Sequence, residues 1–65
     1  MKVIGLEDLP NHYLIQAIST VESAPSIYTL ERLILGGESL KGEATWESIA
    51  NFIDKAQNLA ILDIE

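Results

Sequence analysis

The chain has 65 residues, with ten Asp and Glu against four Lys and Arg, a formal net charge of −6 and no cysteine. This length limits it to a single small domain, residues 1–65, and the lack of cysteine excludes disulfides and cysteine-bound metals. So few basic residues argue against direct nucleic-acid binding and against attraction to anionic membranes. The apolar share of 48% is too high for a disordered acidic tail. The composition therefore indicates a folded acidic domain.

The N-terminal residues do not resemble a signal peptide, because the sequence turns acidic at Glu7 and Asp8 without a long apolar stretch. The longest uninterrupted apolar run covers residues 59–62, far below the ~20 residues that cross a bilayer. We therefore expect a cytoplasmic protein without a membrane span. Because the chain starts at Met1, we also expect it to be a complete small gene product.

A first helix is predicted from about Leu9 to Glu22. Asp8 can cap its start, and Pro10 suits a first turn, where its missing N–H costs nothing. Helical spacing gives a polar face made of His12, Gln16, Ser19, Thr20 and Ser23. The opposite, apolar face holds Tyr13, Leu14, Ala17, Ile18 and Val21.

A second helix is predicted from Pro25 to about Leu35, with Gly36-Gly37 as its C-cap. Its residues are apolar nearly all round, which is typical of a helix buried on several sides. We expect it to be the central element of the domain or to face a second chain.

Residues 38–44 are predicted to be a loop, and a third helix begins near Thr45 as N-cap. Its apolar stripe holds Trp46, Ile49, Ala50, Ile53, Ala56 and Ala60. Core packing is the expected role of Trp46, and anchoring an interface is the alternative. Most of the tail up to Glu65 is expected to extend this helix, and Lys2 to Leu6 to form an extended arm. Alternation of period two at both ends leaves a short strand pairing of the termini open. No internal repeat is visible, and the predicted fold class is an all-α domain of three helices with an extended N-terminal arm.

No arrangement of residues predicts catalysis. His12 is the single histidine, and with Asp8 four residues earlier it supplies at most two metal ligands, so no metal or cofactor is expected. The serines lie at predicted helix ends and turns, where hydroxyls bond to the backbone. No nucleophile elbow or phosphate-binding glycine loop occurs. We therefore do not expect an enzyme.

An acidic row is the first candidate binding feature. Glu43, Glu47 and Asp54 fall at i, i+4 and i+11, with Glu38 in the loop before them. Such a row can steer a partner protein with a basic surface. The alternative is a solvated face whose first carboxylates complement the helix dipole.

An apolar surplus is the second candidate feature, because a domain of this size has little interior. Self-association, most simply as a homodimer, would bury the residues we assign to it: Tyr28, Ile61, Leu62 and Ile64. One alternative is that the same surface docks on a different protein. The other is a tightly packed monomer that folds these side chains over its own core.

The predicted function is that of a small acidic protein-binding module, an adaptor or inhibitor that occupies a surface on a partner protein. The first alternative is a structural subunit that assembles with itself. The second is a helix-turn-helix regulator whose second helix presents Arg32, and the scarcity of basic residues argues against it.

Overall fold

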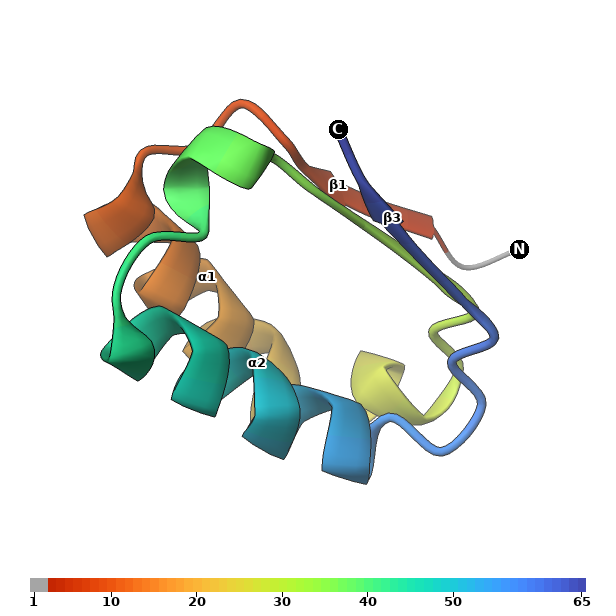
Figure 1. Ribbon diagram of the computed structural model, residues 1–65. Coiled ribbons are helices and arrows are strands. Elements are labelled where there is room, and N and C mark those ends of the chain that lie inside the picture. The colour runs from red at the N-terminus through yellow and green to blue at the C-terminus, as the bar shows by residue number, and fades with distance from the viewer. Residues whose placement is uncertain (1–2) are drawn as a thin grey trace.

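The computed structural model describes residues 3–65, which form two layers (Figure 1). One layer is a parallel sheet of strands β1 (Val3–Leu6), β2 (Arg32–Leu35) and β3 (Ile61–Ile64). The other layer holds helices α1 (Asn11–Glu22) and α2 (Glu43–Lys55). Two short 3₁₀ helices, η1 (Pro25–Tyr28) and η2 (Gly37–Ser39), lie in the connections. The prediction of an all-α three-helix domain is therefore wrong.

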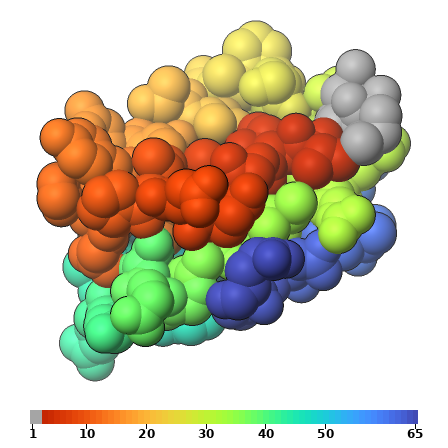
Figure 2. All heavy atoms as spheres, turned by 90° about the horizontal axis from the view of Figure 1, so that it is seen from above, coloured from red at the N-terminus to blue at the C-terminus, as the bar shows by residue number. Residues whose placement is uncertain are grey.

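The chain coils in one direction through the two layers. The strands pair in chain order, β1-β2-β3, and both connecting helices cover the same face of the sheet. Figure 2 shows the residues of β1 in red, those of β2 in yellow-green and those of β3 in dark blue, side by side in this order. Val3 pairs with Arg32, and Arg32 pairs with Ile61, so both steps advance the chain by the same number of positions. We call this common offset the repeat period.

The repeat period corrects the expectation that the sequence has no internal repeat. In the second and third strands and just before them, the repeat is visible in the residues themselves, because Leu30, Leu33 and Leu35 recur as Leu59, Leu62 and Ile64. The helices between the strands hide it, since α1 follows β1 after a shorter connection than the one that joins β2 to α2.

Residues 25–35, predicted to be one helix, form η1 and β2 instead. Leu33 and Leu35 point toward the helices and are 0% exposed, while Arg32 lies on the exposed side. A middle strand of a parallel sheet is often a nearly continuous apolar run, and periodicity alone cannot distinguish a short run of this kind from a buried helix.

Gly36 and Gly37 follow a strand and do not cap a helix. Gly36 is buried against the preceding turn of the chain, and a Cβ atom built on it would lie 2.3 Å from the carbonyl oxygen of Glu7. We call each strand, together with the segment that leads to the next strand, one turn of the coil. Glycine therefore permits the close approach of the first and second turns at this point.

Residues 61–64, predicted to extend the third helix, form β3, and part of the predicted arm forms β1, while Lys2 lies outside the described residues. Both strands pair with β2, so the two strands at the ends of the chain do not pair with each other. The alternation of period two in Leu62, Asp63 and Ile64 was the correct signal, because it places Asp63 on the opposite side of the strand from the two apolar residues.

The first helix is confirmed, with its polar face exposed, but neither helix starts as predicted. Pro10 occupies the N-cap of α1, and among the described residues no side chain, Asp8 included, caps the helix. α2 starts at Glu43 after Gly42, whose φ of 95° favours glycine. Thr45, predicted to be the cap, is buried and donates its hydroxyl proton to the carbonyl oxygen of Lys41.

The core lies between the two layers. Its buried apolar side chains are Leu14, Ile18, Ile27, Leu30, Leu33, Leu35, Leu40, Ile49, Phe52 and Ala56. Two polar contacts join the helices beside this core: the Asn11 amide donates to the Thr45 hydroxyl at 2.9 Å, and the Lys55 ammonium lies 3.6 Å from the Glu22 carboxylate. These contacts fix the position of α1 relative to α2 along the helix axes.

Candidate functional site

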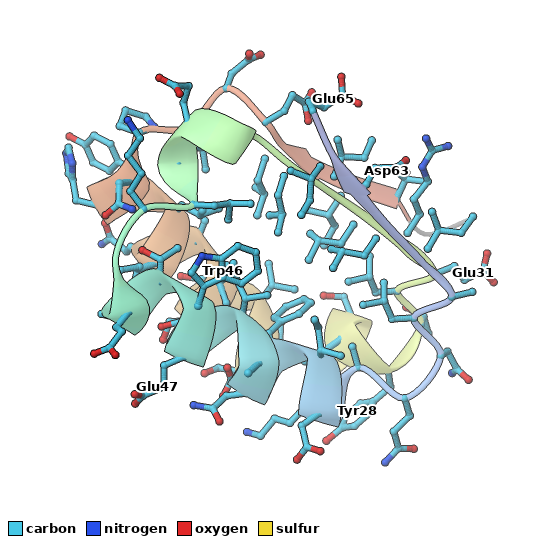
Figure 3. The ribbon with its side chains drawn as sticks, viewed as in Figure 1. Tyr28, Glu31, Trp46, Glu47, Asp63 and Glu65 are labelled. Atoms are coloured by element: carbon cyan, nitrogen blue, oxygen red, sulfur yellow. The ribbon has the colours of Figure 1, made fainter. Side chains whose placement is uncertain are left out.

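The acidic row exists as a geometric feature of α2. Glu43, Glu47 and Asp54 all lie in α2 and are exposed, and Figure 3 shows Glu47 pointing away from the rest of the molecule. Glu38 lies in η2, where its carboxylate is 3.9 Å from the Lys41 ammonium. Among the residues that the structure describes, no further group on this row indicates a ligand, so its role in partner binding stays a prediction.

The four residues assigned to self-association do not form one surface. Leu62 and Ile64 are in register with the buried Leu33 and Leu35 of β2, so they point toward the helical layer. Ile61 points the other way, to the outer face of the sheet, and Tyr28 lies in η1. Only Leu62 and Ile64 are brought together.

Two further apolar residues, predicted to lie on the apolar stripe of the third helix, lie at the surface instead. Trp46 is 46% exposed and Ile53 is 40% exposed. They lie about half a helical turn around α2 from Lys55, which contacts Glu22 of α1. Trp46 is held in place by its indole N–H, which donates to the Leu40 carbonyl oxygen at 3.0 Å.

We call the surface formed by Trp46, Ile53, Leu62 and Ile64, together with the outer edge of β3, the end face. It faces the viewer in Figures 1 and 3, where α2 and β3 lie in front of α1 and the other strands. Leu62 and Ile64 are 39% and 51% exposed, although they point to the same side as the fully buried residues of β2. Among residues 3–65, no strand pairs with the outer edge of β3.

The end face has two features that can bind another polypeptide: a strand edge and exposed apolar side chains. An unpaired strand edge presents backbone N–H and C=O groups that can bind a further strand. Leu62 and Ile64 belong to this strand, and Trp46 and Ile53 lie in the helical layer on the same face; all four side chains are large and uncharged. Neighbouring exposed apolar residues of this kind mark surfaces that bind other polypeptides. The arrangement can therefore take up a strand and an apolar helix side at once.

The opposite end of the coil has a similar edge. We call the outer edge of β1 and the adjoining side of α1 the start face. That side of α1 contains a hollow of about 310 Å³, lined by Leu9, Tyr13, Gln16, Ala17 and Thr20. Tyr13, predicted to lie on the apolar face of its helix, is 53% exposed beside this hollow. Within the part of the chain that the structure describes, no strand pairs with this edge of β1.

A shallow hollow of about 670 Å³ lies where the three strands begin, on the outer face of the sheet. It is lined by Val3, Thr29, Glu31, Arg32, Asn58, Ala60 and Ile61. The Arg32 guanidinium donates to the Asp63 carboxylate at 2.7 Å, a diagonal contact between β2 and β3 on this face. The basic side chain of this hollow is thus already engaged by an acidic neighbour.

Asp8 and His12, the two residues considered as metal ligands, are both exposed. His12 lies at the surface with its ring centroid 4.3 Å from that of Tyr13. Within residues 3–65, no group of three or more His, Asp or Glu side chains is placed to hold a metal ion. The same residues include no helix of the length and apolar character needed to cross a membrane. The helix-turn-helix arrangement is also absent from this part of the chain, because β2 replaces its second helix.

Comparison with known proteins finds no matching family model, no similar curated protein and no similar solved structure. The site must therefore be interpreted from its own geometry. Of the end face, Leu62 and Ile64 were predicted from the sequence to be surface residues, whereas core packing was the expected role of Trp46 and Ile53 was placed on the same apolar stripe. The signal that could have found them is the repeat period, which predicts a stack of turns with an uncovered last turn.

Proposed function

We propose that this chain is a protein-binding module whose binding surface is the end face, and that its partner supplies a strand and a helix with the same repeat period. The observation that carries this proposal is the contrast along the sheet: the inward side chains of β2 are fully buried, whereas those of β3 are not. In a stack of strand–helix turns, each turn buries its apolar side against the next.

The repeat pattern supports this interpretation. Leu30-x-x-Leu33-x-Leu35 and Leu59-x-x-Leu62-x-Ile64 follow one spacing and are separated by the repeat period. This spacing and this period resemble those of leucine-rich repeats, in which single turns cannot bury their apolar sides alone. The resemblance is one of pattern, and residues 1–6 follow the same spacing, with Met1, Ile4 and Leu6 at the positions of Leu30, Leu33 and Leu35.

The partner is identified by what the end face lacks. The β3 edge needs a parallel strand, because β1, β2 and β3 are all parallel and share one register. To be covered, Trp46 and Ile53 need the apolar side of another helix. That helix would lie at the same position along the axis of α2 as α1, on the side of α2 opposite to α1. An adaptor or inhibitor of this kind would attach to its partner by extending the sheet, while the acidic row of α2 stays in solvent.

A chain lengthened by one turn tests the proposal. A copy of residues 37–64 is appended after Glu65, so that Glu65 takes the position that Gly36 has in the second turn. The tryptophan of the appended copy is replaced by phenylalanine, which leaves Trp46 as the only tryptophan. We expect the unfolding midpoint to rise by about 10 °C, because an added neighbour contributes roughly 2 kcal/mol at about 4–8 °C per kcal/mol.

Trp46 fluorescence provides the second measurement, since the side chain is 46% exposed in the free chain and would be covered in the lengthened one. Its emission should move to shorter wavelength. The matched control is an extension of the same composition in shuffled order, which should change neither quantity. An ordered-sequence extension that leaves both the midpoint and the Trp46 emission unchanged would show that the end face does not bind such a unit.

A further inference from the structure

The start face has a strand edge and a helix side that can pair with those of the end face, and both faces belong to the same chain. We propose that the strand–helix unit bound by the end face is the first turn of a second copy of this chain, which gives a head-to-tail assembly. This inference rests on the proposed function, and it adds the identity of the partner. It follows from two spacings within one molecule, the spacing between paired strands and the spacing between α1 and α2.

The strand spacing is the first. The repeat period aligns β1 with β2 and β2 with β3. One further step of the same period places β1 of a second copy beside β3. Ile4 of that copy then lies next to Leu62, and Leu6 of that copy lies next to Ile64. Both pairs point toward the helical layer, so the exposed inward side of β3 is covered by apolar side chains.

The helix spacing is the second. Glu22 meets Lys55 and Asn11 meets Thr45, and these contacts define which residues of α1 and α2 lie at the same height. The same relation to a second copy places its Tyr13 beside Trp46 and its Thr20 beside Ile53. Tyr13 and Trp46 are both about half exposed in the free chain. The hollow bounded by Ala17 and Thr20 lies beside Tyr13, where it can receive the larger side chains of α2 from the other copy.

The charges at the rim set how this contact responds to salt. Glu7 and Glu65 occupy equivalent positions one residue after β1 and β3, so stacking brings Glu7 of one copy beside Glu65 of the other. Each copy also has a net charge of −6. Salt screens this repulsion, and association therefore strengthens as salt increases. A partner attracted by the acidic row of α2 would show the opposite dependence.

The assembly is open-ended, because each copy uses one face to bind forward and a different face to bind backward. The longer dimensions of the molecule, 26 and 20 Å, bound an end face of about 500 Å², below the roughly 800 Å² per partner of a standard interface. Association should therefore be weak and should depend on concentration, with no preferred size at the dimer.

Disulfide capture between two single-cysteine variants tests the proposal, because the natural chain has no cysteine. Val3 and Ile61 point to the outer face of the sheet, and stacking makes them neighbours in adjacent strands. Neighbouring strands are about 4.8 Å apart, within reach of a disulfide. Within one copy the two residues are two strands apart, roughly 10 Å, which is too far.

Val3→Cys and Ile61→Cys chains are mixed under mild oxidation. We expect the mixed dimer to exceed either same-variant dimer by about tenfold, with a yield that increases with protein concentration and with salt. Val3→Cys mixed with Asn51→Cys, whose cysteine lies on the exposed side of α2, is the matched control and should give only random dimers. Adding Tyr13→Asp to the Val3→Cys chain should lower the mixed yield about tenfold while helical circular dichroism is kept, since Tyr13 lies outside the core.

The outcomes separate this inference from the proposed function. If all dimers form in random proportions although the lengthened chain is stabilised, the end face binds a strand–helix unit and a second copy is not its partner. If the lengthened chain is not stabilised either, both proposals are wrong. A mixed dimer that is preferred but unaffected by Tyr13→Asp would contradict the helix contact, and with it the stacked arrangement.

Discussion

Strands β2 and β3 have nearly the same pattern of side chains and very different surroundings. Leu33 and Leu35 of β2 are 0% exposed, while Leu62 and Ile64, at the equivalent positions of β3, are 39% and 51% exposed. Within residues 3–65, β2 has a strand on each side, whereas β3 has a strand on one side only. In this coil, the burial of a side chain therefore depends on the neighbouring turn as much as on its own residue type.

This difference has an energetic consequence. In stacked repeats, stability is approximately a sum over turns and over contacts between neighbouring turns. The middle turn takes part in two such contacts and the last turn in one. The same substitution should therefore cost more in β2 than in β3, and the contrast between the two strands can be measured directly.

The largest difference is expected between Leu33→Ala and Leu62→Ala. Leu33 is fully buried, and truncating such a side chain typically costs about 3 kcal/mol, through lost burial and the cavity that remains. That is a large part of the stability of a domain of this size. Leu62 is more than a third exposed, and its truncation should cost about 1 kcal/mol or less.

Urea unfolding followed by circular dichroism measures both costs. The Leu33→Ala chain should unfold at a much lower urea concentration than the natural chain, whereas the Leu62→Ala chain should unfold in a single transition slightly below the natural one. Equal losses of unfolding free energy for the two variants would show that β3 is as fully packed as β2. The end face would then be no open surface.

The second contrast is between two adjacent glycines, Gly36 and Gly37. A Cβ at Gly36 would lie 2.3 Å from the Glu7 carbonyl oxygen, a backbone atom that cannot move without shifting the first turn. A Cβ at Gly37 would lie 3.2 Å from the carbonyl oxygen of Glu65, at the less constrained last turn. We expect Gly36→Ala to cost about 2 kcal/mol and Gly37→Ala to change stability by less than about 0.5 kcal/mol.

Thermal unfolding of the two variants, with helical content checked at low temperature, tests this contrast. Both substitutions add the same methyl group to neighbouring positions, so differences in the unfolded chain largely cancel. A Gly37→Ala chain less stable than the Gly36→Ala chain would mean that the last turn is packed more tightly than the first, contrary to the exposure of β3.

The sequence predicted the parts of the fold that local periodicity determines. Helix α1 followed from its polar and apolar faces, and α2 was found, although it starts earlier, at Glu43, and ends earlier, at Lys55, than predicted. The strands were missed because they are short, and in β2 the consecutive apolar residues Leu33, Ile34 and Leu35 fit a buried helix as well as a buried strand. Only the pairing of strands separated by the repeat period distinguishes the two, and that pairing is not a local property.

The candidate site was predictable to the same extent. Leu62 and Ile64 were recognised as apolar residues in excess of what the core can hold, and this reasoning needs composition alone. Trp46 was placed in the core because it shares the helical spacing of the apolar stripe with Ile49 and Ala56. Its exposure arises because no helix of the described chain covers that side of α2, which depends on the stacking of whole turns. Residue type and spacing within one helix do not contain that information.

The smallest effect is expected for the ion pair that joins the two strands, Arg32 with Asp63. The guanidinium N–H donates to the carboxylate at 2.7 Å, but the two side chains are 45% and 33% exposed. Exposed pairs of this kind contribute about 0.2–1 kcal/mol, and salt weakens them further. A double-mutant cycle of Arg32→Met and Asp63→Asn, measured by urea unfolding at low and high salt, gives the coupling without the separate effects of each substitution.

A coupling below about 1 kcal/mol that falls with salt would mean that β3 is held mainly by its backbone bonds to β2 and by Leu59, which packs against the core. The strand would then keep its place when the pair is removed, and the end face would keep its shape in the Arg32→Met chain. A coupling well above that value, insensitive to salt, would instead make the ion pair a main support of the last turn. The difference between β2 and β3 would then reflect how firmly the strand is attached as well as how fully it is covered.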